Sequence, residues 1–296
     1  MASIDENKKI WTNENSWEFG GNEWSKAWGS VDAEWYFFIF PRIKKLNKKN
    51  STILEIAPGH GRWSEYLIKM SKKYIGVDLS KTCIDYCKYR FYGRRNTRFY
   101  LNDGKSLDMI KDNSIDFCFS FDSLVHADRD AVGAYIEELS KKLKEKSYAF
   151  IHHSNYLQYK SNPNFNENHA HFRAKNVDYL YVQEVCKKYN MHVVSQELIK
   201  WMQYPDYIDC ISVIYKDSTA NNIVTDVFFS KYYDFTQEYG QCLADKYGFK
   251  DERDFVQPNK HSLKYRLITI SPQKIKNFVI KNLKHKIKWY LVLLRC

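Results

Sequence analysis

The stretch ILEIAPGHGRW, residues 53–63, decides the fold of this 296-residue chain. Apolar residues that favour strands surround one acid, Glu55, and a turn with Gly59 and Gly61 follows them. Glycines let the backbone approach a ligand, and open α/β sheets bind ligands beyond the carboxyl ends of their strands. The stretch therefore predicts a first strand that ends in a ligand-binding turn, although a turn needed only for packing has the same sequence pattern.

Apolar runs alternate with amphipathic, helix-like segments from about residue 50 to residue 153. A further helix is expected near 177–189, and two strands joined by a link too short for a crossover follow it. The pattern predicts a Rossmann-like, doubly wound α/β sheet that is mostly parallel and closes with an antiparallel hairpin. The expected strands are 52–57, 74–78, 97–101, 115–121, 147–153, 191–201 and 207–216, and the expected crossover helices are 62–72, 80–92 and 128–145.

The chain divides into three regions on this reading. Residues 1–50 are rich in tryptophan and are predicted to form a lid over a bound ligand, with a plain apolar strap as the alternative. Residues 51–216 form the α/β domain. Residues 217–296 are expected to be mostly helical, with a break near QPNKHS (257–262) and a basic amphipathic tail.

The residues around the glycine turn favour a cationic ligand over a pyrophosphate. A dinucleotide turn usually reads G-x-G-x-x-G, and here Ser64 takes the place of the third glycine. Glu55 before the turn repels a phosphate and attracts an ammonium or a sulfonium group. Asp78 ends the second strand, where it can accept from ribose hydroxyls, and Asp103 follows the third strand, where it can accept from an adenine amino group. S-adenosylmethionine is a ligand of this description.

These residues resemble the motifs of a known family. The run Glu55-x-x-x-Gly59-x-Gly61, Asp78, Asp103 and FSFDS (119–123) resembles motifs I to IV of class I S-adenosylmethionine-dependent methyltransferases, over about residues 50–216. The resemblance implies that S-adenosyl-L-methionine is the cofactor. It also implies that the motif residues and their neighbours hold it, namely Glu55, Ala57, Gly59, Gly61, Trp63, Asp78, Leu79, Asp103, Gly104 and Phe121.

A narrower resemblance concerns the acceptor. Segments that include SFDSLVHAD (120–128) and IHHSN (151–155) resemble a methyltransferase subgroup found in bacterial surface-polysaccharide (O-antigen or capsule) synthesis. This implies methylation of a sugar hydroxyl in a surface glycan or in a nucleotide- or lipid-linked sugar precursor. Methylation of a sugar-linked phosphate, which would end chain growth, is the alternative reaction. A cofactor-binding scaffold protein that has lost turnover is the alternative of another class.

A sugar hydroxyl needs a base to take its proton as the new bond forms. His126 follows the fourth strand and is the first candidate for the base, and His152 or His153 at the end of the fifth strand is the second. Strand alternation points these adjacent rings to opposite faces, so at most one faces the acceptor. Asp122 is expected to orient an imidazole or to contact the cofactor. For each histidine, a structural hydrogen bond is the alternative role.

No metal site is predicted. His169 and His171 lie close in sequence to His152 and His153, and imidazoles with Asp122 can bind a divalent cation, but the spacing fits no established metal pattern.

The net charge of +11 belongs to the end of the chain. After Asp254 there are ten lysines and arginines and no acid, whereas residues 1–254 hold 36 basic and 35 acidic residues. An enzyme that acts on nucleic acid needs a basic face around its cleft, so nucleic acid is not expected as a partner.

The basic tail KIKNFVIKNLKHKIKWYLVLLRC (274–296) carries apolar residues at helical spacing with lysines between them. Such a helix suits an anionic membrane surface, and the alternative is a helix that docks on its own domain or in a dimer interface. No signal peptide and no run of about 18 apolar residues is visible. We expect a cytoplasmic protein, with attachment to the inner face of the membrane through the tail as one alternative. The oligomeric state is left open.

Overall fold

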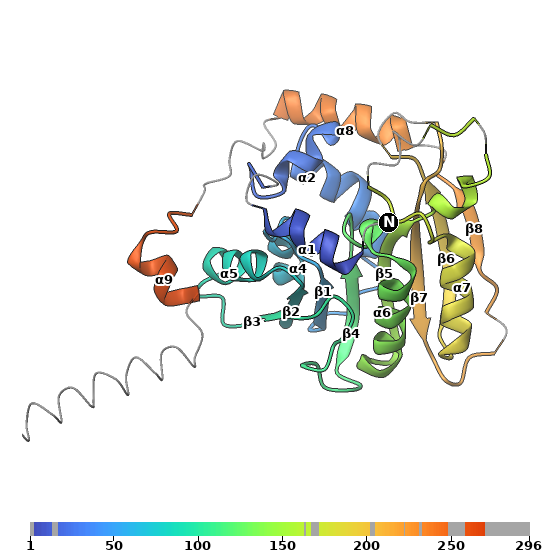
Figure 1. Ribbon diagram of the computed structural model, residues 1–296, viewed down its shortest axis with the longest axis horizontal. Helices are drawn as coiled ribbons and strands as arrows, with labels where there is room; N and C mark the ends of the chain where they lie inside the picture. Colours follow the sequence, from blue (N-terminus) through green and yellow to red (C-terminus); the bar gives the residue numbers. More distant parts are fainter. Residues whose placement is uncertain are drawn as a thin grey trace, which may run out of the picture.

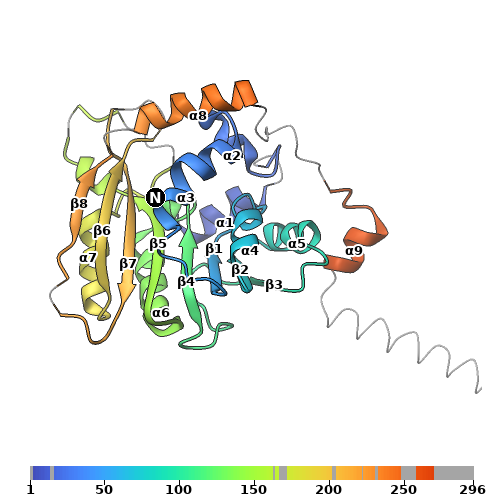
Figure 2. The same cartoon turned by 180° about the vertical axis from the view of Figure 1, so that it is seen from behind.

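The computed structural model describes residues 3–13, 17–162, 164–166, 172–201, 205–221, 223–230, 233–247 and 258–269. In this part of the chain an eight-stranded sheet has the order β3-β2-β1-β4-β5-β7-β6-β8 (Figures 1 and 2). Strand β7 runs antiparallel to its neighbours β5 and β6, and the other neighbouring pairs are parallel. This confirms the predicted fold class. The strands are β1 (Thr52–Ile56), β2 (Lys73–Asp78), β3 (Thr97–Leu101), β4 (Ile115–Ser120), β5 (Leu143–Ser154), β6 (His192–Ile199), β7 (Asp209–Lys216) and β8 (Asp226–Phe229).

Helices cover both faces of the sheet. Helices α6 (Arg129–Lys142) and α7 (Tyr179–Lys188) pack on one face, and α4 (Ser64–Met70) and α5 (Lys81–Arg90) pack on the other. Side chains at the helix starts satisfy backbone N–H groups that have no partner inside the helix. The caps of α5, α6 and α7 are Ser80, Asp128 and Asp178.

The N-terminal segment crosses the carboxyl ends of the strands. Helix α1 (Ile4–Thr12) begins at a capping box, in which Ser3 and Glu6 each accept from the other's backbone N–H. It packs against α5 (Figure 1). The chain continues through η2 (Asn22–Trp28), α2 (Val31–Ala33), η3 (Glu34–Ile39) and α3 (Phe40–Ile43).

Two described helices follow the sheet. Helix α8 (Tyr233–Tyr247) lies along α2 at the top of Figure 1 and packs on it and on η2. Helix α9 (Leu263–Thr269) packs against α5, with the rings of Tyr89 and Tyr265 5.2 Å apart. Within the described residues, no helix is long and apolar enough to cross a membrane.

The structure corrects the sequence prediction at two elements. After residue 216 the described residues form helices α8 and α9, and also a short strand that the sequence did not predict: Asp226–Phe229 form β8, which pairs in parallel with β6 at the edge of the sheet. Helix α6 ends at Lys142 rather than at 145, because Leu143 adopts an extended backbone and pairs with Ile115. The predicted basic tail lies outside the described residues, so the structure does not test its amphipathic helix.

Candidate active site

A cavity of about 100 Å³ lies at the carboxyl ends of the central strands. Its walls come from the glycine turn after β1, the ends of β2 and β4, and the N-terminal segment. Of the predicted site residues, those that line the cavity are Ala57, Gly59, Trp63, Asp78, Leu79, Gly104, Phe121, Asp122 and His126.

Asp78 fixes the shape of the glycine turn. One oxygen of its carboxylate accepts from the N–H of Gly59 at 3.0 Å, and the other accepts from the N–H of Ser80 at 2.8 Å. Burial raises the pKa of Asp78 to about 6, and the backbone donors oppose that rise. The carboxylate is therefore mostly ionised at neutral pH and can accept further hydrogen bonds from a ligand.

Glu55 does not line the cavity. Its carboxylate is buried on the far side of the turn and accepts from the hydroxyls of Ser64 and Tyr74. Burial raises the pKa of Glu55 to about 7, so at neutral pH it carries only part of a negative charge. Glu55 is therefore not placed to contact a cationic ligand in the cavity, contrary to the prediction from sequence.

Two other predicted cofactor contacts also lie outside the cavity lining. Asp103 is exposed and accepts from the N–H groups of Lys105 and Ser106, which makes a turn at the end of β3. Gly61 faces the core, where an added Cβ would stand 2.6 Å from the ring of Phe91.

The three predicted histidines have different surroundings. His126 lies in η4 (Leu124–His126) and lines the cavity; its Nδ1 is 3.1 Å from the carbonyl oxygen of Phe172, and its ring lies 5.2 Å from that of Trp11. His153 is fully buried on the other face of the sheet, between the carbonyl of Ser154 and the hydroxyl of Ser212. Burial lowers the pKa of His153 to about 4. His153 therefore does not face the acceptor, which is a correction to its candidacy as the base.

His152 is a supporting residue rather than a wall of the cavity. Its Nδ1 accepts from the backbone N–H of Asp122 at 3.1 Å, and its Nε2 lies 3.3 Å from a carboxylate oxygen of Asp209. Asp209 is itself held by the guanidinium of Arg173, at 2.9 and 2.7 Å. His152 is absent from the cavity lining, so the structure does not place its ring where the base predicted from sequence would stand.

Asp122 and Arg62 form an ion pair in the cavity wall. The guanidinium of Arg62 lies 2.9 Å from the carboxylate of Asp122 and donates to the hydroxyl of Ser25 at 3.1 Å. Arg62 was not predicted as a site residue, although it follows Gly61 within the quoted stretch. Arg42 makes a two-bond ion pair with Glu197 and does not line the cavity.

The N-terminal segment covers the cavity. In the described residues 3–13 and 17–28, here called the N-terminal cover, Asn7 donates to the carbonyl of His126 at 2.8 Å. The ring of Trp17 stacks on that of His60, with ring centroids 4.5 Å apart. The same ring lies directly over Gly59, where an added Cβ would stand 2.4 Å from it. The tryptophans of this cover are visible in the sequence pattern; helix α1 was not predicted, and its sequence signal is the capping box at Ser3.

The charges that line the cavity suit the cofactor that the motifs imply. The charged residues of its lining are three acids, Asp78, Asp122 and Asp128, and one base, Arg62. An excess of acids suits a sulfonium. Gly59 has a positive φ of 57°, which brings the backbone close to the cavity without a Cβ. Among the described residues, no group of three or more histidines, cysteines and acids could hold a metal ion, and His169 and His171 lie outside them.

A pH dependence of stability follows from the burial of Glu55. Its pKa of about 7 in the folded protein exceeds the ordinary value of 4.5, so folding favours its protonated form. This contribution is fully present below pH 4.5 and is lost as pH rises to 7, by up to about 3 kcal/mol. We expect Glu55→Gln to flatten the fall in unfolding free energy between pH 5 and pH 7, measured by urea denaturation. The exposed Glu184→Gln control should keep the parent's slope, and an unchanged slope in Glu55→Gln would contradict the prediction.

Comparison with known proteins agrees with this site. A family described as "Methyltransferase domain" matches residues 53–146, which run from β1 into β5. No curated protein matches the sequence.

Two solved structures show the same fold. One is a chain in the complex between the Haloferax volcanii Trm112 methyltransferase activator and a methyltransferase, with 16% identity, a TM-score of 0.51, and coverage of 69% of this chain and 98% of that one. The other is the PH0226 protein of Pyrococcus horikoshii OT3, with 17% identity, a TM-score of 0.50, and coverage of 69% and 96%. The fold, the cavity and the matched domain agree, and this chain carries a methyltransferase domain that uses S-adenosylmethionine as the methyl donor.

Proposed function

We propose that this methyltransferase acts on a hydroxyl of a sugar in a surface glycan or its nucleotide- or lipid-linked precursor, with His126 as the base. The observation that carries the proposal is the place of His126 in the cavity wall, with its Nδ1 against a backbone carbonyl. Nδ1 lies 3.1 Å from the carbonyl oxygen of Phe172. A carbonyl only accepts, so Nδ1 bears the proton and Nε2 bears the lone pair in the neutral ring. An imidazole in this state can take a hydroxyl proton.

The walls of the cavity support a sugar acceptor. Aromatic rings offer flat apolar faces on which the C–H face of a sugar can pack, and indole N–H groups add donors at their edges. The tryptophans that line the cavity are Trp11, Trp17, Trp24, Trp63 and Trp201.

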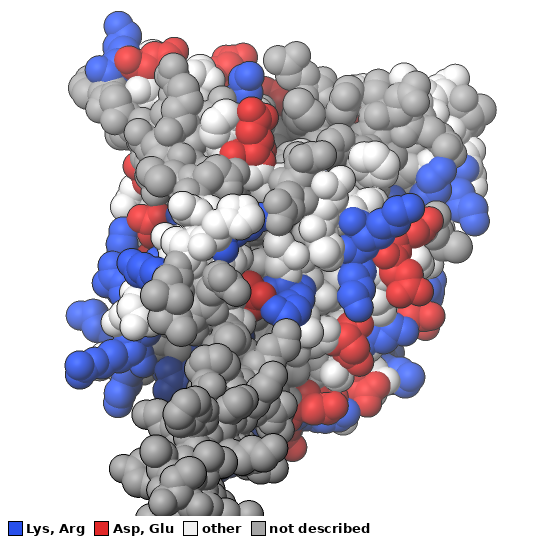
Figure 3. Space-filling view, turned by 60° about the vertical axis from the view of Figure 1, so that its left-hand side comes forward, with Lys and Arg blue, Asp and Glu red and all other residues white. Residues whose placement is uncertain are grey.

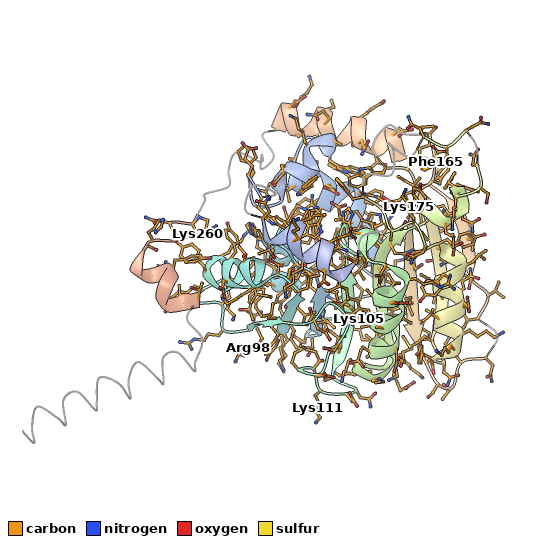
Figure 4. All side chains as sticks on the ribbon, in the orientation of Figure 1. Arg98, Lys105, Lys111, Phe165, Lys175 and Lys260 are labelled. Carbon is orange, nitrogen blue, oxygen red and sulfur yellow. The ribbon has the colours of Figure 1, made fainter. Side chains whose placement is uncertain are left out.

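The charges in the cavity favour a hydroxyl over a phosphate. A phosphate group is usually held by several cationic donors. Among the described residues that line the cavity, Arg62 is the one lysine or arginine. Exposed cations such as Arg98 and Lys111 extend from the periphery of the molecule (Figure 4). Methylation of a sugar-linked phosphate is therefore the less favoured reaction.

The same charges argue against a nucleic-acid acceptor. Binding to a polyphosphate backbone requires a basic surface around the site. The face shown in Figure 3 carries lysines and arginines together with aspartates and glutamates. The cavity itself has more acids than bases.

The residues of the chain then have separate tasks. S-adenosylmethionine, when bound, supplies an activated methyl group. His126 holds a lone pair for the hydroxyl proton, and the ring of Trp11 beside it limits its motion. The N-terminal cover excludes water and fixes the acceptor, and such orientation supplies much of the rate in a displacement reaction. A scaffold without turnover would not need His126 in this state.

We also propose that the enzyme works in the cytoplasm, at the inner face of the membrane, where lipid-linked precursors are accessible. The support for this is the basic amphipathic sequence 274–296.

Mass spectrometry of the surface glycan tests the proposal. Deletion of the gene should remove one CH₂ from each methylated sugar, and the parent gene should restore it while His126→Gln should not. Loss of a methyl phosphate signal in phosphorus NMR would identify the alternative acceptor instead. A glycan whose methylation does not respond to the gene would contradict both reactions.

The glycine turn gives a prediction about cofactor affinity. A Cβ on Gly59 would stand 2.4 Å from the ring of Trp17, and φ is positive there. We expect Gly59→Ala to weaken binding of S-adenosylhomocysteine by roughly tenfold or more. The new Cβ strains the backbone of the turn by about 1 to 3 kcal/mol and displaces the ring packed on it, so the turn no longer has the shape that binds the ligand. Gly93→Ala is the matched control, since Gly93 also has a positive φ but has open space around it. Equal affinities of the two variants in calorimetry would contradict a close approach at Gly59.

A further inference from the structure

We propose that the Arg62–Asp122 ion pair binds the α-amino-acid group of the cofactor, the guanidinium receiving its carboxylate and the aspartate receiving its ammonium. The proposal concerns the cofactor alone and does not depend on the identity of the acceptor.

The position of the pair supports this assignment. Arg62 directly follows the glycine turn, and Asp122 lies two residues after the end of β4, so the pair bridges the two motifs that border the cavity. Both side chains line the cavity and are largely buried, with exposed fractions of 9% and 8%. A charged group that enters beside Gly59 therefore meets this pair at short range and in a poorly hydrated environment, where electrostatic interactions are strong.

The charges of the pair match those of the ligand. An α-amino-acid group carries a positive and a negative charge on neighbouring atoms, and a lone cation or lone anion would match only one of them. An arginine beside an aspartate presents both signs at a separation of 2.9 Å. Charge-assisted hydrogen bonds of this kind are about twice as strong as neutral ones.

The other acids near the turn have different tasks. Glu55 faces Ser64 and Tyr74 and does not line the cavity. Asp78 accepts from two backbone N–H groups of the turn, and Asp128 caps α6. Asp122 is thus the lining acid whose carboxylate faces a cation rather than the backbone.

Neighbouring groups hold both members of the pair in place. Arg62 donates to Ser25 of the N-terminal cover, and its guanidinium lies 4.4 Å from the ring centre of Trp63. The backbone of Asp122 has a positive φ of 57° and donates to His152 at 3.1 Å. Because the pair is preorganised, little conformational entropy is lost when a ligand binds it. The bond to Ser25 also links occupancy of the pair to the position of the cover.

Calorimetry with two ligands tests the assignment. S-adenosylhomocysteine carries the amino-acid group, and 5′-methylthioadenosine has the same nucleoside thioether without it. We expect Arg62→Met and Asp122→Asn each to weaken S-adenosylhomocysteine binding by roughly 10- to 100-fold, the loss of a charged hydrogen bond. Binding of 5′-methylthioadenosine should stay the same in both variants. Arg62→Lys, which keeps the charge, should retain part of the preference for S-adenosylhomocysteine.

A matched control is available on another part of the chain. Arg42→Met breaks the two-bond ion pair with Glu197, which is not part of the cavity lining, and should leave the affinities for both ligands unchanged. If Arg62→Met and Asp122→Asn weaken both ligands equally, the pair only supports the structure and the proposal is wrong. Unchanged S-adenosylhomocysteine affinity in either variant would also overturn it. Neither result bears on the sugar acceptor, because no acceptor is present.

Discussion

We expect His126→Gln to lower kcat by roughly 10²- to 10⁴-fold, the contribution of a positioned general base. Nδ1 of His126 faces the carbonyl of Phe172, so Nε2 holds the lone pair that a hydroxyl proton requires. Glutamine keeps much of the side-chain volume but cannot take a proton at neutral pH. The KM for S-adenosylmethionine should change little, because the substituted group acts on the acceptor. The measurement is methyl transfer at saturating cofactor, with kcat and KM determined separately for the parent and the variant.

His192→Gln is the matched control for this experiment. His192 also faces a backbone carbonyl, that of Asp217, at 3.1 Å, but it stands at the start of β6 and does not line the cavity. Its substitution should leave kcat as it is in the parent. If His126→Gln keeps the parent's turnover, His126 is not the base, and a phosphate acceptor becomes the better reading.

The second large effect is a loss of stability, which we expect when the buried ion pair of Asp209 and Arg173 is broken. Asp209 and Arg173 are fully buried and joined by two hydrogen bonds of 2.9 and 2.7 Å. Burial alone would raise the pKa of Asp209, but the guanidinium of Arg173 beside it holds that pKa well below its usual range. Asp209→Asn removes the negative charge next to a buried guanidinium, which costs about 3–5 kcal/mol. Urea denaturation at neutral pH should show this loss of unfolding free energy.

The sign of the pH dependence gives a second readout for Asp209. Because its pKa is depressed in the folded protein, its stabilising contribution is present above the ordinary pKa of 3.8 and is lost as pH falls below it. The difference between parent and Asp209→Asn should therefore shrink in acid. Glu197→Gln, which breaks the less buried pair with Arg42, is the control and should cost about 1 kcal/mol or less. If Asp209→Asn and Glu197→Gln lost equal amounts of unfolding free energy, burial would not make the Asp209 pair the more important of the two, which would contradict the prediction.

The sequence predicted seven of the eight described strands and missed the edge strand β8. Strands β1 to β7 and helices α4 to α7 follow from the alternation of apolar runs and amphipathic segments. Strand β8 has four residues, all exposed, and its pairing with β6 is a contact between distant parts of the chain. A segment so short carries no period of its own, and only the tertiary pairing makes it a strand.

The site was predicted by position but not by side-chain direction. Gly59, Asp78, Asp122 and His126 line the cavity because their places at the carboxyl ends of strands follow from the topology. Glu55 points away from the cavity, and no sequence signal shows this, because residues 53–56 of β1 are all buried and the strand has no polar face to compare. The pairing of Arg62 with Asp122 joins residues 60 positions apart, which motif spacing does not reveal.

The central claim is that the cavity under the N-terminal cover is the cofactor site. The most direct test is to titrate the purified protein with S-adenosylhomocysteine and to follow tryptophan fluorescence. Trp11, Trp17 and Trp24 of the cover line that cavity, so the account predicts a saturable change in fluorescence at one site per chain. Nicotinamide adenine dinucleotide should produce no such change. Saturable binding of the dinucleotide, together with no response to S-adenosylhomocysteine, would contradict the account.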